Sequence, residues 1–200
     1  MVGGTAQAQD LFGSTNTTSH RYNYVEAQYL VDVDSTPPVL ATLLLDVWEN
    51  WSIKAEFLKQ DFGNLADDSD PDLTLTAEIT SLSIGGLYHK PFSKIAGSDW
   101  IAGFLLGRSE AEVEIPVLDV LVEEDFSFQE VYAGIRKTLT PKLEGEATVN
   151  YYRNSDEDDV TADIKLVYRV ATSFDVALAG NELGGGEIGN IIGLGLRYTW

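Results

Sequence analysis

The segment 192–200 alternates strictly between apolar residues and small or polar ones. Successive residues of a β-strand point to opposite faces, so this period of two predicts a strand with one apolar and one polar face. A helix would instead repeat its apolar residues every three or four positions. The apolar set is Ile192, Leu194, Leu196, Tyr198 and Trp200, and between them stand Gly193, Gly195, Arg197 and Thr199.

The same alternation recurs along the chain and predicts about ten strands. The six prolines fall between these segments, where no ladder hydrogen bond is required of them. The predicted strands are residues 22–31, 39–47, 51–61, 73–88, 100–108, 126–137, 143–152, 161–170, 174–182 and 191–200.

The connections between these segments alternate in charge. The odd connections are acidic, and the longest, 109–125, is expected to extend as a hairpin. The even connections are mostly shorter and less acidic, and hold Lys90, Lys94, Lys137 and Lys142. In an up-and-down meander alternate connections lie at opposite ends, so one end is predicted to be strongly acidic.

One face of the strands is charged and the other is apolar. A soluble ligand-binding barrel, with the apolar face inside, is one alternative. A transmembrane barrel reverses this, with the charged face lining a narrow lumen where opposite charges pair. The residues predicted to line that lumen are Glu26, Lys54, Glu56, Glu78, Glu130, Arg136, Glu144, Glu146, Asp163, Lys165, Arg169 and Arg197.

Aromatic residues favour the membrane alternative, because they gather near strand ends as in the girdles of outer-membrane barrels. The chain also stops on an aromatic strand, and a barrel must close its last strand on its first, since lipid cannot satisfy an open edge. The fold class is therefore all-β: one closed, antiparallel, up-and-down transmembrane barrel. The predicted interface aromatics are Trp48, Trp51, Trp100, Tyr198 and Trp200.

Three segments carry a resemblance to a known group of proteins. The opening segment 22–29, the closing segment 195–200 and the turn-like 48–51 resemble the small outer-membrane barrels of Gram-negative bacteria, grouped with OmpA-type transmembrane domains and Ax21-like barrels. The resemblance covers most of residues 20–200. It implies periplasmic termini, extracellular acidic loops, contact with outer-membrane lipid and lipopolysaccharide, and a terminal strand read by the barrel-assembly machinery. Trp200 stands at the C-terminal position where such barrels more often have a phenylalanine.

The first residues suggest export. Ala6-Gln7-Ala8 has the small-x-small form of a signal-peptidase site. Residues 1–19 are interpreted as a signal-peptide remnant and N-terminal arm, with a plain flexible arm as the alternative, and residues 20–200 as the barrel domain.

Composition excludes several functions. A net charge of −19 argues against nucleic-acid binding, and the absence of cysteine removes thiol chemistry. His20 and His89 are the only histidines, and neither lies in a catalytic motif, so we predict no enzyme activity and no cofactor. Ca²⁺ or Mg²⁺ at the acidic loops is the one alternative, without EF-hand spacing, through Asp67, Asp68, Asp70, Asp72, Asp156 and Asp158.

Function is less constrained than fold. A structural or interaction role through the acidic loops, with a surface protein partner, is the leading hypothesis. A narrow cation-preferring pore is the second, because acidic mouths attract cations. A hydrolase is the weakest, since no catalytic constellation is present.

Overall fold

The computed structural model describes residues 20–31, 36–67, 70–115, 120–155, 157–183 and 191–200. They form ten strands and, within those ranges, no helix, so none that could cross a membrane. The strands are β1 (Tyr24–Val31), β2 (Thr36–Trp48), β3 (Trp51–Asp67), β4 (Asp70–Pro91), β5 (Ser98–Ile115), β6 (Val120–Thr140), β7 (Leu143–Arg153), β8 (Asp158–Arg169), β9 (Phe174–Leu183) and β10 (Ile191–Thr199).

The strands close into a barrel in which each pairs antiparallel with its neighbours in sequence. The closure is between β1 and β10, where Tyr24 lies opposite Thr199 and Val31 opposite Ile192. The prediction of an all-β, closed, ten-stranded, up-and-down barrel is confirmed. Closure removes the open edges that would otherwise leave backbone groups unpaired.

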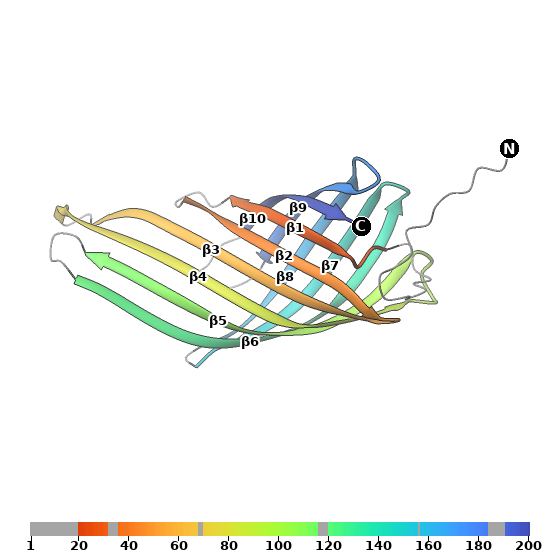
Figure 1. Ribbon diagram of the computed structural model, residues 1–200, viewed down its shortest axis with the longest axis horizontal. Coiled ribbons are helices and arrows are strands. Elements are labelled where there is room, and N and C mark those ends of the chain that lie inside the picture. The colour runs from red at the N-terminus through yellow and green to blue at the C-terminus, as the bar shows by residue number, and fades with distance from the viewer. Residues whose placement is uncertain (1–19, 32–35, 68–69, 116–119, 156, 184–190) are drawn as a thin grey trace.

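Strand length is uneven around the barrel. β3 to β6 contain 17, 22, 18 and 21 residues, whereas β1, β9 and β10 contain 8, 10 and 9. Figure 1 shows these four long strands sweeping well past the others at the end opposite the two termini. The stretch 109–125 forms this hairpin by continuing β5 and β6, and only 116–119 separate the two strands.

Four of the six prolines contradict the expectation that all lie between strands, and one of these, Pro91, is the last residue of β4. Pro37 and Pro38 lie inside β2, and Pro71 lies near the start of β4. The pairing register shifts between Thr36 and Val39, so the β2 prolines occupy an irregularity where the ladder needs no N–H. Pro71 likewise falls between the pairs that Asp70 and Thr74 make with β3.

The faces divide as a membrane barrel requires. Alternate residues of the short strands are buried and largely polar, such as Glu26, Gln28 and Arg197. Their neighbours are apolar and exposed, such as Leu194 at 57 % and Leu196 at 67 %. A soluble barrel would hide these side chains, so the apolar exterior indicates a lipid-facing surface.

Candidate functional site: lumen and outer extension

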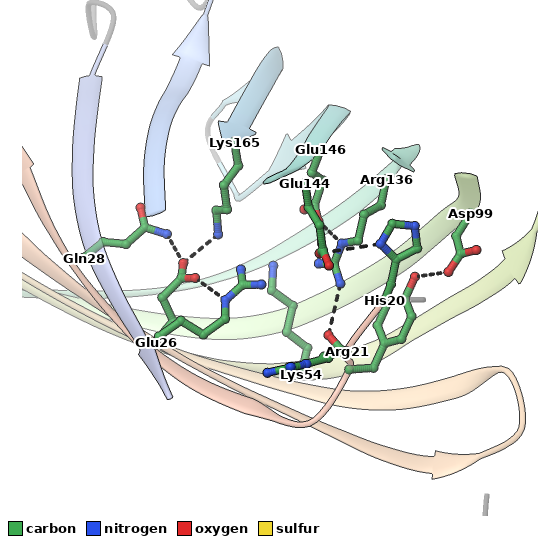
Figure 2. Close-up of polar contacts among 12 residues, drawn as sticks. His20, Arg21, Glu26, Gln28, Lys54, Asp99, Arg136, Glu144, Glu146 and Lys165 are labelled. Carbon is green, nitrogen blue, oxygen red and sulfur yellow. Dashed lines mark hydrogen bonds and ion pairs between the residues drawn. The ribbon is translucent and has the colours of Figure 1, made fainter. Parts of the chain in front are cut away.

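Glu26 lies at the centre of a buried charge network. Its carboxylate accepts hydrogen bonds from Arg197 Nε at 2.6 Å, Lys165 Nζ at 2.8 Å and Gln28 Nε2 at 2.5 Å. Glu26 is on β1, Arg197 on β10 and Lys165 on β8, so one carboxylate joins strands on both sides of the closure. Figure 2 shows Lys165 and Gln28 directed toward Glu26. Buried charges are tolerated when they are paired and hydrogen-bonded in this way.

A second network surrounds Arg136 on β6. Its guanidinium donates to Glu146 on β7, with Nε 2.7 Å from Oε2, and lies 4.7 Å from the centre of the Tyr22 ring. Tyr22 in turn donates to Asp99 at 2.7 Å. In Figure 2, Arg136, Glu146 and Glu144 project toward the segment that precedes β1. That segment therefore lies against the lumen side chains and helps to fill this end.

The lumen between the networks is nearly full. Lys54 lies 2.9 Å from Glu56 and 4.7 Å from the centre of the Tyr132 ring. A cavity of about 40 Å³ in this part of the lumen is bordered by Lys54, Glu56, Tyr132 and Arg136. Such a volume holds a few water molecules.

The positions of the other predicted lumen residues along their strands show which of them point into the barrel and which point out. Glu130 shares its face with buried Tyr132, Asp163 accepts a hydrogen bond from Asn150 at 2.8 Å, and Arg169 lies 3.6 Å from Glu144. All three therefore point inward. Glu78 does not: it has the parity of Leu82 and Ile84, which are 63 % and 61 % exposed.

The placement of Glu78 corrects its assignment to the lumen. It pairs outside with Lys59 at 2.7 Å. The reason is that this part of β4 lies beyond the apolar belt of the barrel. A charged side chain on the outer face is there exposed to water. There the hydrogen bond from Lys59 to Glu78 raises the pKa of the Lys59 amine.

Both histidines are buried beside carboxylates. His20 Nδ1 lies 3.5 Å from Glu144, and His89 Nε2 lies 3.1 Å from Asp46. Ser52 also donates to Asp46, at 2.5 Å. In this chain of hydrogen bonds the aspartate stands between the serine and the histidine. A catalytic triad instead needs the histidine between the serine and the aspartate. Tyr22 stacks on His89 beside this cluster, with the two ring centroids 3.7 Å apart.

The predicted interface aromatics all lie at one end of the barrel and point outward. Trp48 and Trp51 flank the β2–β3 turn, and Trp100 stands near the start of β5. Tyr198 and Trp200 stack at 6.1 Å where the chain ends. Tyr29, Phe57 and Tyr151 form a sparser exposed group at the other end.

The four long strands form what we call the outer extension: residues 58–62 of β3, 76–81 of β4, 108–114 of β5 and 120–128 of β6. Its outer face is acidic in rows across the sheet. Asp61 lies opposite Glu78, which lies opposite Glu112, which lies opposite Glu123. In the next row Glu110 lies opposite Asp125, which accepts two hydrogen bonds from Arg108.

The inner face of the outer extension is apolar. Ala77, Val113 and Val122 lie directly opposite one another across β4, β5 and β6. Phe128 packs 5.4 Å from Tyr152 at the base of this face. The apolar face therefore changes sides along these strands. It is the outer face in the barrel and the inner face in the outer extension.

Of the predicted metal ligands, only the side chain of Asp158 lies among the described residues. Asp68, Asp156 and the side chains of Asp67, Asp70 and Asp72 lie outside the described residues. Asp158 lies at the start of β8, where it accepts a hydrogen bond from Tyr151 at 3.4 Å. Across the positions that the structure describes, no three acidic or histidine side chains are arranged to hold a metal ion.

Comparisons with known proteins concern the fold. No family model matches the sequence, and the search of curated proteins finds no relative. The translocator domain of the autotransporter NalP from Neisseria meningitidis is similar with a TM-score of 0.56 and 12 % identity, over 89 % of this chain and 68 % of that one. The chain has the fold of an outer-membrane β-barrel.

Smaller outer-membrane barrels are also matched. The N-terminal barrel domain of OprF from Pseudomonas aeruginosa gives a TM-score of 0.45 at 10 % identity, over 88 % of this chain and 96 % of that one. Neisserial surface protein A gives 0.42 at 10 % identity, over 88 % and 94 %.

Sequence reasoning missed two features of this outer-membrane barrel. One is the full width of the outer extension: the hairpin at 109–125 was expected, but not that β3 and β4 continue beside it. The signal for the hairpin was present: Glu110, Glu112 and Glu114 alternate with Ala111 and Val113. The other is the role of Tyr22, His20 and Arg21, which precede β1. Arg136 donates to the Arg21 carbonyl at 3.4 Å, a contact between residues 115 positions apart.

Proposed function

We propose that the protein is a sealed bacterial outer-membrane barrel that anchors a surface-interaction sheet, the outer extension. The observation that carries the proposal is the unequal strand length: β4 has 22 residues and β10 has 9, although both cross the same barrel. About 9–11 tilted residues cross a bilayer. The excess in β3 to β6 therefore serves something beyond the membrane.

The filled lumen supports the same proposal. Glu26, Arg136 and Lys54 reach into the interior and are each engaged by an opposite charge. A selective pore needs a path in which ions bind weakly enough to leave. A cavity of about 40 Å³ between paired charges provides no such path. The narrow cation-preferring pore is therefore the weaker proposal, and hydrolysis is weaker still.

The distribution of charge supports the proposed orientation. The acidic extension and the apolar belt below it fit an extension facing outward, with both termini in the periplasm. Partners would then include outer-membrane lipid and lipopolysaccharide, a surface protein, and the assembly machinery during insertion. Ion binding at the acidic loops is not required by this proposal.

Single-channel recording tests the sealed barrel. We expect the refolded full chain, with insertion checked by protease protection, to give no discrete current steps in a planar bilayer. Steady cation-selective steps that shrink when Glu56 or Glu130 is neutralised would overturn the proposal in favour of a pore. Glu78→Gln is the matched control, because that carboxylate lies outside the lumen and leaves any current unchanged.

A further inference from the structure

The long strand β6 has a free edge. β5 pairs with β6 over its whole length, from Ser98 opposite Lys137 to Ile115 opposite Val120. β7 pairs with β6 only from Gln129 to Thr140. On the side away from β5, residues 120–128 thus have no strand partner among the described residues. An unpaired strand edge is a template for a further strand.

The backbone groups that face this edge can be assigned. Thr138 donates its N–H to the carbonyl of Gly97, on the β5 side. Successive residues of a strand turn their backbone groups to opposite sides, and the β5–β6 register runs without a shift from Lys137 to Val120. The odd-numbered residues therefore direct N–H and C=O away from β5. In the free edge these are Leu121, Glu123, Asp125 and Ser127.

The side chains along the edge differ on the two faces. Glu123 and Asp125 lie on the outer face, each opposite another acidic residue of β5, Glu112 and Glu110. Val120 and Val122 lie on the inner face and are 40 % and 51 % exposed. Phe126 and Phe128 continue this inner face toward the barrel, and Glu124 is its charged member.

We propose that the free edge of β6, residues 120–128, accepts an extended segment of a partner protein as an added β-strand, with basic residues on its outer face and apolar residues on its inner face. Directly opposite residues of paired strands interact, and opposite charges stabilise the pair. Lysine or arginine beside Glu123 would relieve the repulsion within its acidic row, and a cation beside Asp125 would add to the one that Arg108 already provides. Apolar residues beside Val122 and Phe126 would cover surface that is now exposed.

A second copy of the chain is the less favoured occupant. Two β6 edges pairing antiparallel would bring Glu123 and Asp125 of one copy close to the same acidic pair of the other. Like charges directly opposite are destabilising. The acidic edge thus discourages self-association while leaving the backbone groups open to a basic strand.

This inference rests on the proposed function, because it assigns the binding mode of the outer extension. The probe is a capped, fluorescent peptide of about ten residues that alternates lysine and valine. Binding to the full chain in phosphatidylcholine nanodiscs is measured by anisotropy. Two control peptides separate strand addition from charge attraction: one with the same composition in a lysine block and a valine block, and one alternating glutamate and valine. Empty nanodiscs control for lipid binding.

A matched pair of variants tests the backbone groups. Glu123→Pro removes an N–H that faces the free edge, without a hydrogen bond to β5, and Glu123→Gln removes the same charge but keeps the N–H. We expect Glu123→Pro to weaken the lysine–valine peptide about tenfold or more, and Glu123→Gln about threefold or less. Circular dichroism and gel mobility confirm that both variants fold.

The outcomes are distinct. Equal binding of the alternating and block peptides, or equal effects of the two variants, would overturn strand addition in favour of charge attraction. A dimer of the unliganded protein in analytical ultracentrifugation, lost in Glu123→Pro, would assign the edge to a second copy. A sealed barrel that binds no peptide overturns this inference alone, whereas ionic current overturns the proposed function itself.

Discussion

Glu26 on β1 lies directly opposite Arg197 on β10, and their side chains are joined at 2.6 Å inside the barrel. The two residues are 171 positions apart, so this contact exists only when the first and last strands have met. Both side chains are almost completely buried. The ion pair therefore links the chemistry of the lumen to the closure of the fold.

Glu26→Gln should destabilise the barrel strongly. The change leaves Arg197 and Lys165 buried without their shared carboxylate, and breaking a buried pair costs about 3–5 kcal/mol. Urea unfolding in lipid vesicles, followed by tryptophan fluorescence, measures the loss. Glu78→Gln is the control, since its pair with Lys59 is exposed, and should change little. Equal loss in the two variants would show that the Glu26 network does not stabilise closure.

Lys54→Ser combined with Arg136→Ser should open the lumen. Both side chains border the cavity, and their removal leaves Glu56 and Glu146 as an acidic lining. We expect small cation-selective current steps in planar bilayers from the double variant. Ser81→Ala with Ser127→Ala, in the outer extension, should leave the barrel silent. A silent double variant that is folded and inserted would place the block elsewhere in the lumen.

Leu196→Arg should impair membrane insertion. Leu196 is 67 % exposed on the outward face of β10, between Leu194 and Tyr198. An arginine facing lipid near the bilayer midplane costs about 2–4 kcal/mol. The fraction that becomes protease-protected in vesicles measures insertion. Ser127→Arg, exposed on the outer extension, is the matched control, and a similar defect there would contradict the position of the apolar belt.

Cysteine labelling should establish orientation, because the chain has no cysteine of its own. Glu123→Cys lies in the outer extension and Lys142→Cys in the turn between β6 and β7 at the opposite end. In intact Gram-negative cells we expect a membrane-impermeant maleimide to label the first and to label the second only after the outer membrane is opened. The reverse pattern would invert the proposed topology.

Much of the barrel could be predicted because lipid-facing strands impose a strict local period. Leu194, Leu196 and Tyr198 show one face directly, and Arg197 and Thr199 show the other. The same alternation predicted which residues point into the lumen, and Glu78 is the exception. Its segment has passed the membrane, where water is outside the sheet, so the apolar face turns inward and the local rule reverses.

The sequence by itself determined the strand number, the alternation and the acidic character of one end, since these depend on neighbours a few positions apart. Only the tertiary structure decided which charges meet. Lys165 reaches Glu26 across 139 positions, and no local pattern encodes that register. The free edge of β6 was also decided there, because it exists only through the difference in length between β6 and the neighbour that pairs with it.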